Sequence, residues 1–285
     1  MSRILKKTQL SRDVFRMELE APDIARERKA GQFVIIQADS DFSERIPLTI
    51  ADADETAGSI SIIFQVVGKS TLKLAQKNTG ESVENILGPL GMPTHIENFG
   101  TVVCVGGGIG VAPMHPIAQA MKKAGNKVII IIGSRTKDLL ILEDEMRAIA
   151  DEFIVCTDDG SYGRKDLVTV PLKELCERGG IDLVVAIGPP IMMKFCAETT
   201  RPFNVKTYAS LNTIMVDGTG MCGGCRVTVG GKTKFVCVDG PEFDAHQVDF
   251  DNMMLRLRSY KPQEQDANHR CHLQEAVDRL QEQSK

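Results

Sequence analysis

The middle of this sequence alternates short apolar runs with helical stretches, and this alternation limits the fold more than any other feature. The apolar runs lie at residues 101–105, 128–132, 153–156 and 183–187, and the helical stretches lie at residues 114–123, 142–150 and 172–178. Strands that alternate with helices are typical of a parallel sheet. We therefore expect a doubly wound α/β domain over residues 98–208.

The first part of the chain has a different pattern. Short stretches rich in Val, Ile and Phe, such as residues 32–37 and 60–67, are separated by polar or glycine-containing turns. Because helical periodicity is weak there, this pattern predicts a small antiparallel β-barrel over residues 1–97.

Two further segments follow the α/β pattern. Residues 209–245 are rich in Gly and Cys, which indicates a small folded module, and residues 246–285 are polar and helical. In this C-terminal segment Leu273, Ala276, Val277 and Leu280 form a stripe at helical spacing. The stripe can dock on a partner or pack back on its own domain.

Composition excludes several classes of protein. The chain has 285 residues, of which 42% are hydrophobic, and its net charge is −4. This is typical of a globular protein with enough apolar material for a core, and it disfavours a nucleic-acid-binding protein. The N-terminal residues lack the apolar core of a signal peptide, and no apolar run approaches the roughly 20 residues that cross a bilayer. We expect a cytoplasmic protein without a membrane span.

Five of the eight cysteines are scattered singly, and they are Cys104, Cys156, Cys176, Cys196 and Cys271. Cys104 and Cys156 lie in apolar strand runs, where a cysteine acts as a small buried hydrophobic residue. Without a secretory signal, a disulfide framework is not expected, so the remaining three cysteines indicate metal or redox chemistry.

These three cysteines form a spaced motif. Cys222 and Cys225 are separated by two glycines, Cys237 follows after eleven intervening residues, and Asp217 precedes Cys222 by five positions. The plant-type [2Fe–2S] spacing has four cysteines, and Asp217 stands where the first would be. The glycines favour a cluster, because they let backbone N–H groups approach sulfur. The alternatives are a turn-forming Asp217 beside a three-cysteine zinc site or an incomplete cluster.

Two glycine-containing turns follow predicted strands. Gly107, Gly108, Ile109 and Gly110 lie between a strand and a helix, a context in which backbone amides bind a pyrophosphate. Gly188 and Pro189 follow a later strand, at the edge where open α/β sheets bind ligands. Each turn alone is also typical of an ordinary strand–helix connection, but together they favour a nicotinamide nucleotide.

Asp158 and Asp159 follow the third predicted strand. Carboxylates repel a 2′-phosphate and accept a ribose hydroxyl, so this pair favours NAD(H) over NADP(H). Arg135 and Arg164 are close in the sequence and weaken this preference.

In the predicted barrel, two short motifs stand at strand or loop edges. Arg45 and the amides near Gly68 can bind a diphosphate, and Thr49 can bond a flavin edge. By spacing alone, these are more typical of ordinary turn and strand residues than of a flavin site.

Taken together, the motifs resemble those of one family. RIPLT, GKST, LGPLG, VCVGGGIGVAPM, GPPIMM and DGTGMCGGC occur in the order of the ferredoxin–NADP reductase superfamily. The [2Fe–2S]-bearing branch that includes the dihydroorotate dehydrogenase electron-transfer subunit is similar over nearly the whole chain. The module with Asp217 in place of the first cysteine most resembles the small subunits of NADH-dependent reduced ferredoxin:NADP⁺ oxidoreductase, also known as sulfide dehydrogenase subunits.

The resemblance implies three cofactors. It implies FAD in the barrel, on Arg45, Pro47, Leu48, Thr49, Gly68, Lys69, Ser70 and Thr71. It implies NAD(H) on Gly107, Gly108, Ile109, Gly110, Asp158, Gly188 and Pro189. It implies a [2Fe–2S] cluster on Asp217, Cys222, Cys225 and Cys237. The sequence departs from the family at Ile187, where many reductases have Cys, and at Leu48, where plant-type enzymes have Tyr.

The implied function is electron transfer. Flavin-mediated hydride exchange needs no protein acid or base, so we assign no catalytic residue beyond the contact expected from Thr49. The resemblance implies a heterodimer with a larger flavin and [4Fe–4S] subunit that binds NADP(H) and ferredoxin. In that complex this chain either takes part in electron bifurcation or simply relays electrons, and the sequence leaves both open. The alternatives are a dihydroorotate dehydrogenase electron-transfer subunit, for which Asp217 is unfavourable, and a non-catalytic scaffold stabilised by zinc.

Overall fold

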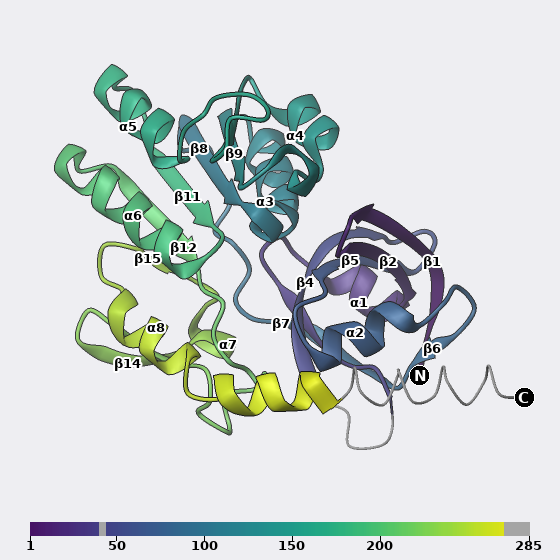
Figure 1. Ribbon diagram of the computed structural model, residues 1–285. Helices are drawn as coiled ribbons and strands as arrows, with labels where there is room; N and C mark the ends of the chain where they lie inside the picture. The colour runs from purple at the N-terminus through teal and green to yellow at the C-terminus, as the bar shows by residue number, and fades with distance from the viewer. Residues whose placement is uncertain (40–43, 271–285) are drawn as a thin grey trace, which may run out of the picture.

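An antiparallel barrel forms the N-terminal part of the computed structural model, which describes residues 1–39 and 44–270 (Figure 1). Its strands within these residues are β1 (Ser2–Ser11), β2 (Val14–Glu20), β3 (Phe33–Gln37), β4 (Arg45–Asp54), β5 (Ser59–Gln65), β6 (Ser82–Val83) and β7 (Asn85–Leu90). They hydrogen-bond in the order β6-β1-β2-β5-β4-β3-β7. Two short helices, α1 (Pro22–Glu27) and α2 (Lys69–Gln76), complete this unit.

The barrel core follows from alternation along the strands. Met17 and Leu19 on β2 and Ile60, Ile62 and Phe64 on β5 are buried in one apolar cluster. Residues two apart in a strand lie on the same face, so each strand contributes every second side chain to this core.

A second sheet lies beside the barrel. Its strands among the described residues are β8 (Thr101–Gly107), β9 (Lys127–Ser134), β10 (Glu152–Thr157), β11 (Leu183–Ile187), β12 (Lys206–Ser210) and β15 (Glu242–Asp244). The order is β10-β9-β8-β11-β12-β15, and every pairing is parallel except that of β12 with β15. The connecting helices are α3 (Val111–Lys123), α4 (Glu143–Ile149), α5 (Thr169–Arg178) and α6 (Pro190–Thr200), with short 3₁₀ turns η1 (Gly108–Gly110), η2 (Lys137–Leu139) and η3 (Arg201–Phe203).

Both faces of this sheet are covered by helices (Figure 1). Cys104 on β8 belongs to the apolar cluster that includes Met114 of α3, whereas Val103 belongs to the cluster that includes Leu172 of α5. Two-sided burial explains why these strands are continuous apolar runs in the sequence. The expected barrel and doubly wound parallel sheet are confirmed.

The cysteine-containing module follows β12. It includes the hairpin of β13 (Arg226–Val229) and β14 (Lys232–Phe235) and the short helix α7 (Val236–Asp239), after which the chain returns to the parallel sheet as β15. Helix α8 (Phe250–Leu257) packs on α6 and β13, and residues 261–270 are again helical. The predicted stripe at Leu273, Ala276, Val277 and Leu280 and the single Cys271 lie outside the described residues. No helix among the described residues is both long and apolar enough to pass through a bilayer.

Candidate functional site

The two glycine-containing turns lie against each other at the carboxyl edge of the parallel sheet. Gly107 ends β8, Gly110 ends η1, and residues 188–189 join β11 to α6. A Cβ atom on Gly110 would lie 2.3 Å from the carbonyl oxygen of Ile187, and one on Gly107 would lie 2.3 Å from Sδ of Met192. The close approach of the two turns therefore requires glycine at position 110, where the obstacle is backbone, whereas a side chain at position 107 would displace the side chain of Met192.

The other side of the first turn is open. Gly108 has a φ of +54°, and no heavy atom lies within 4 Å of the position that a Cβ atom would take. Helix α3 begins directly afterwards, at Val111, so the N-terminus of the helix lies at this edge; the N–H of Val111 itself donates to the carbonyl oxygen of Gly108. The positive end of the helix dipole and this open turn suit a pyrophosphate.

Asp158 lies at the same edge, directly after β10. Its backbone N–H donates to the carbonyl oxygen of Ser134 (3.1 Å), and its side chain is exposed. The carboxylate of Asp159 accepts bonds from the hydroxyl and the backbone N–H of Ser161, which lower the pKa of Asp159. In the described part of the chain, no side-chain hydrogen bond engages Asp158, so its carboxylate is the one available to a ribose hydroxyl.

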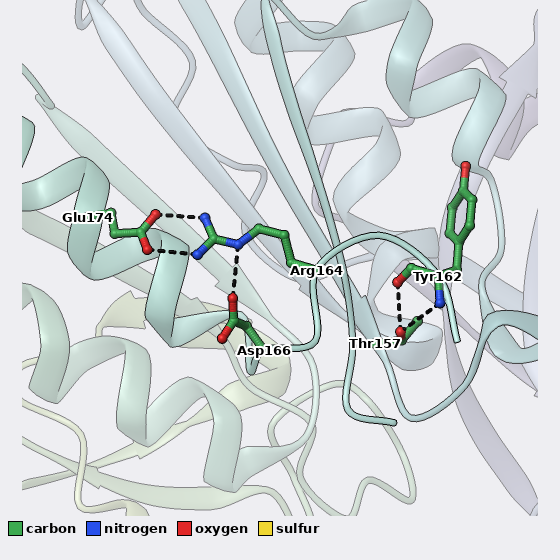
Figure 2. A network of polar contacts seen from close by, with 5 residues as sticks. All are labelled: Thr157, Tyr162, Arg164, Asp166 and Glu174. Atoms are coloured by element: carbon green, nitrogen blue, oxygen red, sulfur yellow. Dashed lines mark hydrogen bonds and ion pairs between the residues drawn. The ribbon is translucent and has the colours of Figure 1, made fainter. Parts of the chain in front are cut away.

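Figure 2 shows that Arg164 is held in ion pairs. Its two Nη atoms donate to the Glu174 carboxylate (2.6 and 2.7 Å), and its Nε donates to Asp166 (2.9 Å). The hydrogen bonds to Glu174, followed by those to Asp166, raise the pKa of Arg164. Arg164 is thus neutralised by carboxylates, whereas Arg135 is exposed and forms no ion pair with any described residue.

The turn that carries Asp158 is fixed by a pair of hydrogen bonds, also visible in Figure 2. The hydroxyl of Thr157 donates to the carbonyl oxygen of Tyr162 (2.6 Å) and accepts from its N–H (3.1 Å). Thr157 is fully buried. These bonds and its burial hold Thr157 in place, so the position of the neighbouring exposed Asp158 is fixed as well.

In the barrel, the structure brings the two predicted flavin motifs together. The first motif lies on β4 and comprises Arg45, Pro47, Leu48 and Thr49, and the second comprises Gly68 before α2 and Lys69, Ser70 and Thr71 at its start. The hydroxyl of Ser70 donates to Glu44, which directly precedes β4 (2.6 Å). The hydroxyl of Thr71 accepts bonds from the N–H groups of Val67 (3.0 Å) and Gly68 (3.2 Å). Thr71 thus fixes the start of α2.

The remaining residues of the first motif line one strand. Arg45 is exposed, and Pro47, Leu48 and Thr49 are half-buried. Thr49 lies opposite Phe33 of β3 in the barrel sheet. This strand and the start of α2 are the surfaces that could hold a flavin.

Two of the proposed cluster ligands form a buried pair. The sulfur atoms of Cys225 and Cys237 are 3.2 Å apart, which is too far for a disulfide bond of about 2.05 Å. The N–H of Cys237 is directed at the sulfur of Cys225 (3.5 Å). Burial raises the pKa of Cys237 to about 12, so the thiol keeps its proton unless a cation replaces it. A close thiol pair with an N–H directed at sulfur fits an iron–sulfur site.

The other two proposed ligands are joined by a backbone bond. One carboxylate oxygen of Asp217 accepts from the N–H of Cys222 (2.9 Å), and the other accepts from the N–H of Thr219 (3.1 Å). These hydrogen bonds, that of Thr219 first, lower the pKa of Asp217. The carboxylate therefore stabilises its loop while keeping lone pairs for a cation. Cys222 is exposed, and its sulfur accepts from the N–H of Gly224 (3.4 Å).

The four proposed ligands are not all brought together. Among the described residues, no three His, Cys, Asp or Glu side chains converge as a metal site. The structure therefore places Cys225 beside Cys237 and connects Asp217 to Cys222, and the joint ligation of iron by all four residues is a proposal.

Known families cover both parts of the site. The model of the iron-sulfur cluster binding domain of dihydroorotate dehydrogenase B matches residues 212–249, and that of the oxidoreductase NAD-binding domain matches residues 104–198. The first range contains all four proposed cluster ligands. The second contains every residue proposed to bind NAD(H).

Whole-chain relatives agree with these matches. The chain is 47% identical over 264 residues to a Thermotoga maritima homologue of the dihydroorotate dehydrogenase B (NAD(+)) electron transfer subunit, with 93% of each chain covered. It is 38% identical over 231 residues to that subunit from Bacillus caldolyticus, with 78% of this chain and 87% of the relative covered. The chain belongs to the dihydroorotate dehydrogenase B electron-transfer subunit family. This is an oxidoreductase family with NAD-binding and iron–sulfur domains.

Solved structures show the same fold for this family member. A chain of the NADH-dependent reduced ferredoxin-NADP oxidoreductase structure is 46% identical, with a TM-score of 0.90 over 95% of this chain and 97% of that one. The cytochrome b5 reductase domain of Ulva prolifera nitrate reductase is 19% identical, with a TM-score of 0.58 over 72% of this chain and 93% of that one, and it shares the fold. The predicted relation to ferredoxin–NADP reductases is confirmed.

Sequence reasoning about this family member missed one half-buried carboxyl group. The hydroxyl of Thr94 donates to Oε1 of Glu242 on β15 (2.6 Å), and burial raises the pKa of Glu242 to about 7. A Cβ atom on Gly31 would lie 3.2 Å from the same oxygen. Glu242, on the edge strand β15 of the parallel sheet, therefore contacts both Gly31 of the barrel and Thr94 of the segment that connects the barrel to the sheet. No local spacing indicates this, because the contact depends on the return of β15 to the sheet.

Proposed function

We propose that this chain is a flavin and iron–sulfur subunit that exchanges hydride with NAD(H) and passes single electrons to or from a larger partner subunit. The observation that carries the proposal is that a nucleotide site and a cysteine site lie in one connected fold. A glycine-lined nucleotide edge and a buried thiol pair are joined by a module whose last strand, β15, belongs to the nucleotide-binding sheet.

The chain's own residues position the nucleotide. The turns at Gly107–Gly110 and Gly188-Pro189 would hold the pyrophosphate of NAD(H), and Asp158 would accept a ribose hydroxyl. Because Arg164 is already paired with Glu174 and Asp166, it does not offer its charge to a 2′-phosphate. This favours NAD(H) over NADP(H).

The barrel and the module would hold the other two groups. The β4 motif from Arg45 to Thr49 and the start of α2 from Gly68 to Thr71 would bind FAD, and Asp217, Cys222, Cys225 and Cys237 would bind a [2Fe–2S] cluster. When bound, FAD converts between hydride transfer and the single-electron transfer of which the cluster is capable. The protein supplies orientation and electrostatics.

The proposed function requires a partner subunit. A subunit of this kind needs an acceptor, and the 46% identical chain comes from the NADH-dependent reduced ferredoxin-NADP oxidoreductase structure. We propose that the chain forms a heterodimer with a larger FAD and [4Fe–4S] subunit that binds NADP(H) and ferredoxin, and that the complex bifurcates electrons. The names of the relatives favour a second candidate, an electron-transfer subunit of dihydroorotate dehydrogenase.

Absorption spectroscopy, metal analysis and co-purification test the proposal. We expect flavin bands with a broad iron–sulfur shoulder, about two iron atoms per chain, and a native partner that contains flavin and [4Fe–4S] clusters. A colourless protein that contains zinc would refute the electron-transfer function. A partner with dihydroorotate dehydrogenase activity would replace the ferredoxin and NADP⁺ assignment by the second candidate.

A further inference from the structure

A peptide group between two of the proposed cluster ligands has a cation at one end and a ligand sulfur at the other. Nη1 of Arg226 donates to the carbonyl oxygen of Gly223 (3.1 Å). The same peptide group carries the N–H of Gly224, which donates to Sγ of Cys222 (3.4 Å). A guanidinium that polarises a carbonyl group makes the N–H of that peptide a stronger donor. The charge of Arg226 is thus directed through one peptide to the sulfur of Cys222.

A second guanidinium holds the next peptide of the turn. Nη2 of Arg256, on α8, donates to the carbonyl oxygen of Gly224 (3.3 Å). Within the part of the chain that the structure describes, neither Arg226 nor Arg256 forms an ion pair with a carboxylate. Two arginine charges therefore lie at the turn between Cys222 and Cys225 without a protein anion to balance them. An anionic group on the cysteines would supply that balance.

We propose that Arg226 is a positioning residue that raises the reduction potential of a cluster on Cys222 by polarising the Gly223–Gly224 peptide, while Arg256 holds the turn. This inference rests on the proposed function, because it requires Cys222 to be a cluster ligand. Reduction adds one negative charge to the cluster, and a hydrogen bond to its sulfur stabilises the more negative state. Arg226 therefore favours the reduced form.

The test compares midpoint potentials of the purified full-length chain, measured by EPR-monitored redox titration. In Arg226→Gln we expect the equilibrium constant for reduction to fall about threefold to tenfold, or ~30–60 mV at 59 mV per tenfold for one electron. Arg226→Lys should give an intermediate potential, because lysine keeps the charge but loses the planar donor group. Arg258→Gln is the matched control. Arg258 is exposed and close in the sequence, but its side chain makes no hydrogen bond to the turn between Cys222 and Cys225 or to any other described residue.

Iron content separates a change in potential from a loss of the cluster. A wild-type potential in an R226Q protein with full iron content would overturn the inference while leaving the proposed function intact. Where R226Q binds less iron, R226K gives the answer: a potential below that of the wild type supports the inference, and an equal one overturns it. A wild-type protein without an iron–sulfur EPR signal would overturn both the proposed function and this inference.

Discussion

Glu242 offers a sharp test of the junction between the barrel and the sheet. Its carboxyl group accepts a hydrogen bond from Thr94 and lies against Gly31, and burial raises its pKa from 4.5 to about 7. Glu242→Gln preserves the shape of the side chain and an oxygen that can accept the Thr94 bond. The substitution removes the ability to ionise and replaces the second oxygen with an amide NH2 group.

The expected magnitude follows from the pKa difference between the folded and unfolded chain. Between pH 4.5 and 7 the unfolded chain releases this proton while the folded chain keeps it, so the free energy of unfolding falls as pH rises through this window. A difference of 2.5 pH units corresponds to roughly 3 kcal/mol at 1.36 kcal/mol per unit. The contribution of Glu242 is therefore most favourable below pH 4.5 and is lost by about pH 7.

Thermal unfolding at pH 5 and pH 8 measures this effect. Wild-type protein and E242Q should have similar midpoints at pH 5, and E242Q should be more stable at pH 8 by up to about 3 kcal/mol, or several degrees for a chain of this size. Glu198→Gln is the control, because Glu198 is exposed on α6. A difference between E242Q and wild type that does not grow with pH would refute the reasoning.

Three further predictions concern the proposed sites. In Gly110→Ala the new Cβ atom would meet the carbonyl oxygen of Ile187 at 2.3 Å, so flavin reduction by NADH in stopped-flow experiments should slow at least tenfold while the bound flavin spectrum is retained. Asp158→Ser should raise the NADPH rate relative to the NADH rate about tenfold, because a repelling carboxylate is removed; an unchanged ratio would contradict this assignment. Asp217→Ala should lower the iron content or change the cluster potential, and unchanged values of both would exclude Asp217 as a ligand.

The local pattern of apolar and polar residues was sufficient to predict the barrel and the parallel sheet. The apolar run at residues 128–132 predicts a buried strand, and β9 is buried from Val128 to Ile132 because helices cover both faces of the sheet. Cys104 and Cys156 lie in strand runs in the sequence, and both are buried in strands of the structure. Such features depend on neighbours along the chain, which periodicity records directly.

Contacts between distant segments were beyond the reach of the sequence. The pairing of Glu242 with Thr94 joins residues 148 positions apart, and no spacing rule reports it. The role of Asp217 in bonding the N–H of Cys222 is likewise set by loop geometry. The two nucleotide turns could each be recognised, but their contact through Gly110 and Ile187 depends on β8 and β11 being neighbours.

The central claim is that one chain connects NAD(H), a flavin and an iron–sulfur cluster. An anaerobic titration of the purified protein with NADH, followed by absorption and EPR spectroscopy, tests it most directly. The account predicts that NADH bleaches the flavin bands and produces the EPR signal of a reduced [2Fe–2S] cluster, with NADPH much less effective. Flavin and cluster signals that NADH leaves unchanged would contradict it.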